Sequence, residues 1–412
     1  MGHHNKSRTI ALVLGVGILV NYFDRVNLSV AHDALQQAFG LSDITFGYLL
    51  GAYSWTYAAM QLPSGSLLDR FGVRRVMIVS IVLWAFASGL AAVASTILVL
   101  FLARGILGIG EAPTFPACAK AIGLWFPPQQ RGVPTATFDA AAKLAVGVGT
   151  PILGLILLRF GLRTNFAVTA VLSAIYVGIF SLLYRDPSPD EVSHTESARQ
   201  VQTTPLNLRE LLQQPKVLGA ALGSGAYNYC FYLLLTWMPF YLQKGLRMTS
   251  RNAVLWSSIP WLAASVIGFI VGGVLPDALI RRGFHPARVR ESILLTGTSL
   301  GIFILTPAFF HNPGVVLVGL SLALSGLSAA SPVLWTLPSL LAPAGSTGRV
   351  GSIMNQSNQL AAIVAPIATG YISTWAHSFA PAFLVAGVIL FAGIASYILL
   401  LGRIEPFTAV TT

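Results

Sequence analysis

Ionisable side chains inside otherwise apolar stretches are the residues of this sequence that could do chemistry. A charged side chain at the centre of a membrane helix costs about 2.5–3.5 kcal/mol on insertion scales, so such residues usually face a water-filled cavity or one another. Guanidinium groups there could bind a carboxylate, and buried acids could bind and release a proton. The candidates are Asp24, Arg25, Arg104, Glu111, Asp139 and Lys143.

Arg104 and Glu111 lie two turns apart on one helical face, about 10 Å along the axis. This spacing disfavours a direct ion pair within the helix, so each side chain can address something in a cavity. We expect an ionised Glu111 to be stabilised by a nearby cation, namely Arg104 through its long side chain or a water molecule. Asp24 and Arg25 are adjacent and point about 100° apart, so they cannot serve one partner equally. The alternative to a role of Arg104 in a cavity is a structural pairing between helices, such as Arg104 with Asp24.

Asp139 and Lys143 are four residues apart, so they can pair directly on one helix. The sequence leaves two interpretations open here. The two side chains could satisfy each other, or Lys143 could contact a substrate.

These residues lie in long apolar segments. Of 412 residues, 55% are hydrophobic and 9% are charged, with a mean hydropathy of +0.72, whereas soluble domains carry about 25% charged residues. A helix needs about 20 apolar residues to cross a bilayer. The sequence predicts an all-α membrane protein with twelve transmembrane helices, at residues 9–33, 43–67, 74–94, 96–124, 132–157, 163–184, 215–242, 252–280, 289–310, 313–341, 350–373 and 379–402.

A polar stretch divides the predicted spans six and six. Residues 1–185 are the predicted N-terminal six-helix bundle, 186–214 a cytoplasmic central loop, and 215–412 the C-terminal six-helix bundle. With the N-terminus inside, seventeen Lys and Arg residues fall in cytoplasmic segments and five in outer ones, as the positive-inside rule requires. This accounts for most of the net charge of +11 without nucleic acid. We expect a multi-pass protein of a bacterial inner membrane with both termini cytoplasmic.

A short motif occurs at matching positions of the two halves. In each, a glycine precedes an aspartate by four residues and paired arginines follow. The repeat indicates an internal duplication, and two such halves rocking about a midplane site are the usual transporter architecture. Its residues are Gly65, Asp69, Arg70, Gly72, Arg74 and Arg75 after the second span, and Gly273, Asp277, Arg281 and Arg282 after the eighth.

Residues 65–75 resemble the loop signature of the major facilitator superfamily, and span count and repeat extend the resemblance over the whole chain. The resemblance implies two pseudo-symmetric six-helix bundles. It also implies that the loop charges bridge the halves on the cytoplasmic side and stabilise the outward-facing state. The alternative is that Arg70, Arg74 and Arg75 are ordinary positive-inside residues.

Four segments, 21–25, 104–112, 186–189 and 351–358, are similar to the anion:cation symporter branch of that superfamily. The branch includes bacterial galactonate, hexuronate and glucarate symporters, sialin and the vesicular glutamate transporters. The resemblance implies that two arginines hold the substrate carboxylate, two acids take up protons, and four further side chains contact the substrate body. These are, in that order, Arg25 and Arg104; Asp24 and Glu111; and Tyr22, Tyr57, Trp335 and Asn355.

Two of these assignments stay open on the residues alone, since Tyr57 and Trp335 could equally be packing aromatics. The chain also departs from its relatives at Asp139 and Lys143, where they often carry a small polar run. A lysine facing the cavity would alter substrate preference.

The resemblance implies a secondary active transporter that takes up a small organic anion, such as a sugar acid, together with a proton by alternating access. The alternative is an exporter of an anionic metabolite or drug from the same superfamily. We expect the partners to be the anion, the proton and membrane lipid, with no nucleic acid, and a monomer. We expect no metal and no cofactor beyond a proton gradient, since carboxylates without an obvious oxygen cage favour protons over sodium. The histidines are scattered and no catalytic motif occurs, so an enzyme is not expected.

Overall fold

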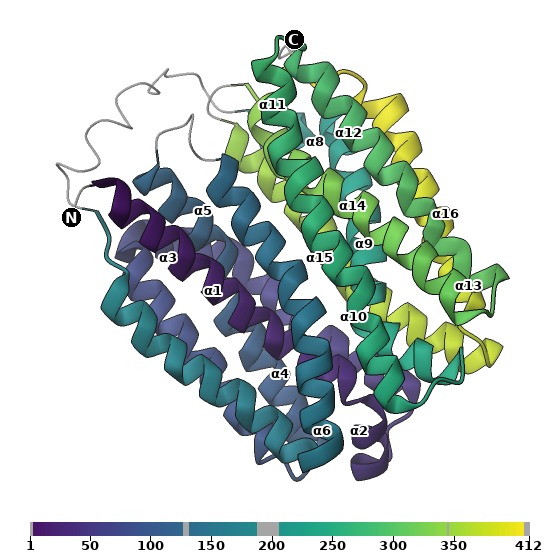
Figure 1. Cartoon of the computed structure of the whole chain (residues 1–412). Helices are drawn as coiled ribbons and strands as arrows, with labels where there is room; N and C mark the ends of the chain where they lie inside the picture. Colours follow the sequence, from purple (N-terminus) through teal and green to yellow (C-terminus); the bar gives the residue numbers. More distant parts are fainter. Residues whose placement is uncertain (1–2, 127–131, 188–205, 344–345, 408–412) are drawn as a thin grey trace.

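Every secondary-structure element in the described part of the chain is helical. The structure is a computed structural model (Figure 1). The all-α prediction is confirmed for the described part. The described residues are 3–126, 132–187, 206–343 and 346–407, without the side chains of 3–8, 62, 69, 132 and 347.

Two helices of the first half each contain two of the predicted spans. In α3 and α6 a glycine with positive φ interrupts the helix, Gly72 (φ 78°) and Gly161 (φ 81°), because glycine adopts this left-handed region without a steric penalty. The predicted span at 96–124 is instead divided between α4 and α5, next to Pro113. The helices are α1 (His3–Val30), α2 (His32–Phe39), α3 (Asp43–Ala92), α4 (Ile97–Glu111), α5 (Thr114–Trp125) and α6 (Gly132–Leu183).

Three predicted spans of the second half, 252–280, 289–310 and 379–402, each combine an α-helix with a π or 3₁₀ stretch. In η2, a π-helical stretch, the helix packs tightly on α14, since a Cβ on Gly268 would lie 2.2 Å from Ser328 Oγ. The elements are α8 (Leu208–Leu212), α9 (Pro215–Lys244), α10 (Ser250–Ile267), η2 (Gly268–Val274), α11 (Leu275–Arg281), α12 (Pro286–Leu300), η3 (Gly301–Leu305), α13 (Thr306–Phe309), α14 (Pro313–Leu341), α15 (Thr347–Ala376), α16 (Ala380–Ser396) and η4 (Tyr397–Leu401).

The described helices are built to cross a membrane. Eight helical runs in the described residues are long and apolar enough, and one of them, Val133–Leu183, contains 51 residues and is interrupted at Gly161. Two further helices, α9 and α15, have 30 residues each but are less apolar. The chain is thus a multi-pass membrane protein, and the exact number of twelve spans stays a prediction.

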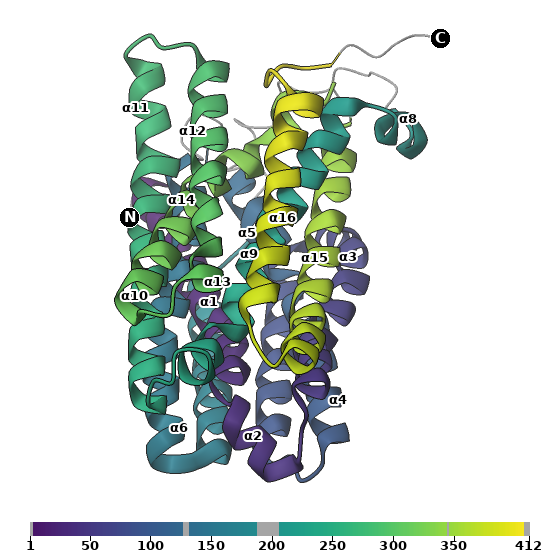
Figure 2. The ribbon, with the colours of Figure 1, turned by 90° about the vertical axis from the view of Figure 1, so that its right-hand side faces the viewer.

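The helices gather into two groups that follow the order of the chain. In Figure 1, α1 and α3 to α6 lie on the left, α2 lies at the bottom, and α9 to α16 lie mostly on the right. Figure 2 shows α2 at one end of the molecule and α11 at the other. We call the first the α2 end. The second, which carries Arg74, Arg75, Arg281 and Arg282, we call the basic end. The predicted domain limits stay predictions, since much of the central loop, residues 188–205, lies outside the described residues.

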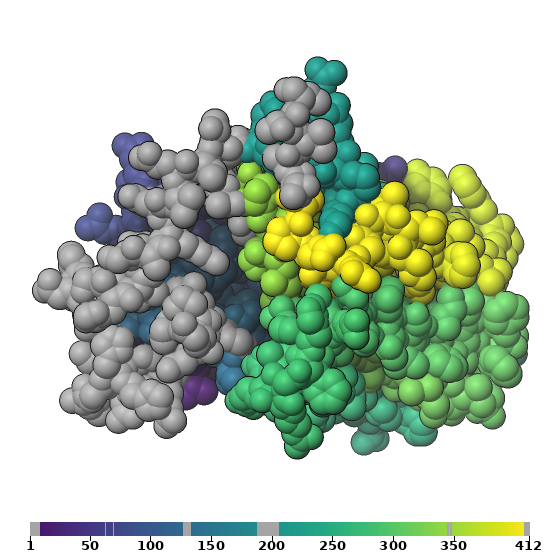
Figure 3. Space-filling model, turned by 90° about the horizontal axis from the view of Figure 1, so that it is seen from above, coloured from purple at the N-terminus to yellow at the C-terminus, as the bar shows by residue number. Residues whose placement is uncertain are grey.

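The two halves are joined by hydrogen bonds at the α2 end. Ser29 Oγ on α1 donates to the backbone oxygen of Thr236 on α9 at 2.9 Å. The hydroxyls of Tyr48 on α3 and Tyr371 on α15 lie 3.1 Å apart. Seen from the basic end, by contrast, the space-filling view shows a hollow between the halves, with blue atoms of the first half deep inside it (Figure 3). The structure is therefore closed at the α2 end and open at the basic end.

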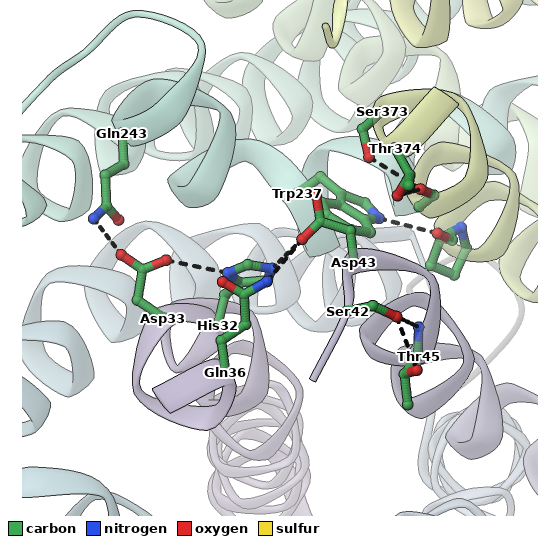
Figure 4. Close-up of polar contacts among 12 residues, drawn as sticks. His32, Asp33, Gln36, Ser42, Asp43, Thr45, Trp237, Gln243, Ser373 and Thr374 are labelled. Carbon is green, nitrogen blue, oxygen red and sulfur yellow. Dashed lines mark hydrogen bonds and ion pairs between the residues drawn. The ribbon is translucent and has the colours of Figure 1, made fainter. Parts of the chain in front are cut away.

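A histidine between two carboxylates supports the closed end (Figure 4). The buried ring of His32 places one nitrogen 3.2 Å from Asp33 Oδ1 and the other 3.2 Å from Asp43 Oδ1. Both contacts are hydrogen bonds when both ring nitrogens carry a proton. Gln243 on α9 donates to Asp33 Oδ2 at 2.5 Å and so links this cluster to the second half. The hydrogen bond with His32 lowers the pKa of Asp33, against the opposing effect of desolvation.

Arg74 of the repeated loop motif bonds to the end of the first half and to the first residue of the central loop. Its backbone N–H donates to both carboxylate oxygens of Asp186, at 3.3 and 3.2 Å, and its Nη2 donates to the backbone oxygen of Ser181 at 2.8 Å. A Cβ on Gly72 would lie 2.7 Å from Asp186 Oδ2, which explains the glycine. The side chain of Asp69 lies outside the described residues. The bridge between halves that the resemblance implies belongs to the opposite, outward-facing state and stays a prediction.

The second copy of the motif is also followed by a glycine with positive φ, but at another position. Gly283 directly follows the paired arginines, with a φ of 93°, whereas Gly72 lies two residues before the arginine pair of the first copy, with a φ of 78°. Asp277 and Arg281 are exposed. The internal duplication therefore stays a prediction from the sequence motif.

Candidate anion and proton site

An ion pair between two transmembrane helices forms the centre of the candidate site. Arg25 Nε on α1 donates to Glu111 Oε2 at the end of α4 at 3.0 Å, and both side chains are buried. We expected Arg104 to stabilise Glu111. The cation in direct contact with Glu111 is instead Arg25, which reaches across from a neighbouring helix, while Arg104 lies two turns away along α4.

Arg104 turns toward α1 without pairing with the acid there. Its Nη1 donates to the backbone oxygen of Asp24 at 3.3 Å rather than to the carboxylate. The Asp24 carboxylate accepts hydrogen bonds from Ser88 Oγ and, at 3.2 Å, from Ser173 Oγ. Serine hydroxyls thus hold the Asp24 carboxylate, while Arg104 makes the alternative structural contact with Asp24 through the backbone oxygen alone and without an ion pair.

Tyrosine rings surround the Arg25 guanidinium. Its Cζ lies 4.5 Å from the ring centroid of Tyr22, 4.9 Å from that of Tyr53 and 5.4 Å from that of Tyr57. The hydroxyl of Tyr232 on α9 accepts a hydrogen bond from Arg25 Nη1 at 3.4 Å. Cation–π contacts of this kind stabilise a desolvated cation. The second half thus contributes one residue, Tyr232, to the surroundings of Arg25.

Three charged atoms of this cluster are buried without a hydrogen-bond partner among the described residues: Arg25 Nη2, Arg104 Nε and Glu111 Oε1. Leaving such atoms unsatisfied is costly, so each calls for an explanation. Two guanidinium N–H groups are the donors that a carboxylate ligand needs, and the bare oxygen of Glu111 is the position that a proton needs. The arrangement can therefore bind an anion and a proton side by side.

Asp139 and Lys143 on α6 satisfy each other across a gap of 2.5 Å. Ser331 on α14 completes the group, because its hydroxyl donates to Asp139 Oδ1 at 3.1 Å and accepts from Lys143 Nζ at 3.4 Å. The paired interpretation is the one that this structure has. The group also joins the two halves, between α6 and α14, which the sequence did not indicate.

The remaining predicted contacts lie farther from the ion pair. The ring of Trp335 on α14 is 48% exposed and stacks on Phe115 of α5, with centroids 6.2 Å apart. Asn355 on α15 is half-buried, and its neighbour Asn358 is the residue that accepts a hydrogen bond, from Ser224 at 2.6 Å. Their roles in binding a substrate stay predictions.

Sequence reasoning missed Tyr53, Tyr232, Ser88 and Ser173. A single tyrosine or serine in an apolar span is usually a packing residue, so the residue type alone did not indicate a role for any of them. The position of Tyr53 could have indicated one, because it lies one turn before the predicted contact Tyr57 and shares its helical face.

Comparison with known proteins identifies the family. The model of the Major Facilitator Superfamily matches residues 14–366. The chain belongs to this superfamily, whose members are transporters, so it is not an enzyme. The predicted resemblance and fold class are confirmed.

Full-length relatives extend the similarity over nearly the whole chain. The chain is 35% identical to the uncharacterized transporter YybO of Bacillus subtilis, over 98% of this chain and 95% of the relative. It is 32% identical to a probable L-galactonate transporter of Escherichia coli, over 95% and 88%. It is 29% identical to a probable sulfoacetate transporter, SauU, of Cupriavidus necator, over 94% and 93%.

A solved structure shares the fold. A bacterial homologue of the human lysosomal transporter Spinster, in an inward-facing and occupied conformation, superposes with a TM-score of 0.74 at 16% identity, over 95% of this chain and 96% of that chain. At this identity the likeness concerns the fold alone.

Proposed function

We propose that this chain is a secondary active transporter that takes up a small organic anion together with a proton by alternating access. The observation that carries the proposal is the pair of buried guanidinium groups, Arg25 and Arg104, near the Glu111 carboxylate, with a polar atom of each left without a hydrogen-bond partner in the described part of the chain. Buried charges of this kind in a membrane protein mark substrate or ion pathways.

The proposed substrate is a carboxylate such as a sugar acid. Two of the similar proteins are named as probable transporters of organic anions, L-galactonate and sulfoacetate, which supports this substrate class. The planar fork of arginine donates two parallel hydrogen bonds to such a head group. The hydroxyls of Tyr57 and Tyr232 beside Arg25 could serve the polar body of a sugar acid.

The proposed coupling is competition for Arg25. In the empty site Glu111 Oε2 accepts from Arg25 Nε at 3.0 Å, which stabilises the ionised carboxylate. An incoming carboxylate draws Arg25 toward itself, and Glu111 then loses its charge-assisted partner in a dry site. The neutral acid is favoured there, so Glu111 binds a proton. Asp24, with its hydroxyl donors, is the second proposed proton site.

The proposed setting is a bacterial inner membrane, with both termini and the basic end in the cytoplasm. The open hollow in Figure 3 then faces the cytoplasm, where the anion and proton would be released. The protein would work as a monomer, driven by the proton gradient without a cofactor.

Glu111→Gln in proteoliposomes tests the proposal. A glutamine keeps the shape and cannot ionise, so proton-driven accumulation of a labelled sugar acid should stop while exchange of labelled for unlabelled substrate continues. Glu405→Gln is the matched control, because Glu405 is exposed at the basic end. Normal accumulation by Glu111→Gln would refute the coupling role. Efflux driven by an imposed gradient, without uptake, would instead support the exporter.

A further inference from the structure

One tyrosine touches all three ionisable groups of the candidate site. The hydroxyl of Tyr53 on α3 donates to Glu111 Oε2 at 2.7 Å. Its ring centroid lies 4.9 Å from Cζ of Arg25 and 5.3 Å from Cζ of Arg104. The side chain is buried, so these contacts form away from water.

The ring of Tyr53 contacts two groups of like charge, the guanidinium groups of Arg25 and Arg104. Arg25 and Arg104 come from different helices and would repel each other in a dry site. A tyrosine ring attracts a guanidinium group through its π face and excludes water from the contact. Both guanidinium groups thus have one common neighbour that sets where they lie relative to each other.

The hydroxyl of Tyr53 has a different effect. It donates to the same oxygen of Glu111 that Arg25 contacts, so Oε2 has two donors and Oε1 has none among the described residues. A donor to a carboxylate favours its ionised form. The other titratable or charged groups that influence Glu111 are Arg104 on its own helix, Asp24 on α1, Tyr57 on α3 and Tyr232 on α9.

We propose that Tyr53 is a positioning residue that links anion binding to proton binding. Its ring fixes Arg25 and Arg104 as a pair that can receive one carboxylate. Its hydroxyl orients Glu111 so that the proton is taken up on Oε1, and it opposes that uptake until Arg25 has been drawn away by the anion. This inference rests on the proposed function and adds the residue that couples its two parts.

Tyr229 provides a matched control within the chain. It lies on α9 and is about as deeply buried as Tyr53. Its hydroxyl has no hydrogen-bond partner among the described residues. Loss of this hydroxyl therefore removes a similar buried group without changing a hydrogen bond to Glu111 or to the two arginines.

The test is the pH dependence of proton-driven uptake in proteoliposomes. Tyr53→Phe removes one donor from Glu111, so the pH at which uptake falls to half on its alkaline side should rise by about 0.5 to 1 unit. KM for the anion should stay within about twofold, because the ring remains. Tyr53→Leu also removes the ring and should raise KM by about tenfold. Tyr229→Phe should leave the pH profile unchanged.

A second measurement keeps the inference falsifiable if Tyr53→Phe folds poorly. Tyr53→3-fluorotyrosine keeps the packing and makes the hydroxyl a stronger donor, so the half-maximal pH should fall instead of rise. If Glu111→Gln abolishes accumulation but Tyr53→Phe and Tyr53→3-fluorotyrosine both leave the pH profile unchanged, the inference about Tyr53 is overturned and the proposed function stands. If Glu111→Gln accumulated substrate normally, the proposed function itself would fail.

Discussion

Gly370→Ala should open the α2 end of the protein. A Cβ on Gly370 of α15 would lie 2.7 Å from the backbone oxygen of Asp43 on α3, where nothing flexible can move aside. The reverse contact is equally close, since a Cβ on Gly47 would lie 2.8 Å from the backbone oxygen of Pro366. The added methyl group is therefore tolerated only when α3 and α15 separate.

The magnitude follows from this overlap. Overpacking a well-packed contact costs about 1–3 kcal/mol. Alternating access separates α3 from α15 at the α2 end, so the cost falls on the closed state alone. The ratio of molecules closed to molecules open at this end should fall about 5- to 150-fold.

Distances between spin labels across the α2 end measure this ratio. Cysteines at the exposed positions Gln37 on α2 and Ala376 on α15 would carry the labels. Gly89→Ala is the matched control, because a Cβ there meets nothing within 4 Å. The argument fails if Gly370→Ala gives the same distance distribution as Gly89→Ala.

Two more predictions concern the other polar groups between the halves. Lys143→Ala leaves the buried Asp139 with Ser331 as its one hydrogen-bond partner among the described residues, which should destabilise the protein by about 3–5 kcal/mol. Thermal unfolding should show that the double variant Asp139→Leu/Lys143→Met regains most of this stability. If the double variant regains none, the two side chains do not act as a pair. The pKa of Asp33 is lowered by its contact with His32, so its ionised form supports the closed α2 end at neutral pH and is lost as the pH falls. The same label distances should therefore lengthen below about pH 4, and Asp33→Asn should remove that dependence.

Much of the fold could be predicted because a membrane imposes simple rules on a sequence. Apolar segments of sufficient length must be helices, since only a helix satisfies its own backbone inside lipid. The position of the helix break next to Pro113 could not be predicted, because a proline is also compatible with an unbroken transmembrane helix. The π-helical stretch at Gly268 depends on the approach of α14, which the local sequence does not contain.

The site was predictable in its parts and not in its pairing. Charges inside apolar spans identify Arg25, Arg104 and Glu111 without any structure. Their spacing along one helix says nothing about which cation crosses to Glu111, because this depends on how α1 packs against α4. Tyr53 stayed hidden for the same reason: its role is set by three neighbours on two other helices.

The candidate site and the closed α2 end lie along the same pair of helices. Arg25 and Ser29 are one turn apart on α1, and their partners Tyr232 and Thr236 are one turn apart on α9. A helical turn rises about 5.4 Å, so Arg25 in the anion site is only one turn from the Ser29–Thr236 hydrogen bond that helps to close this end. A ligand shifts a conformational equilibrium only by its differential affinity for the two states. A carboxylate that replaces Tyr232 at Arg25 removes one contact between α1 and α9, and so helps the loaded protein to leave the closed α2 state.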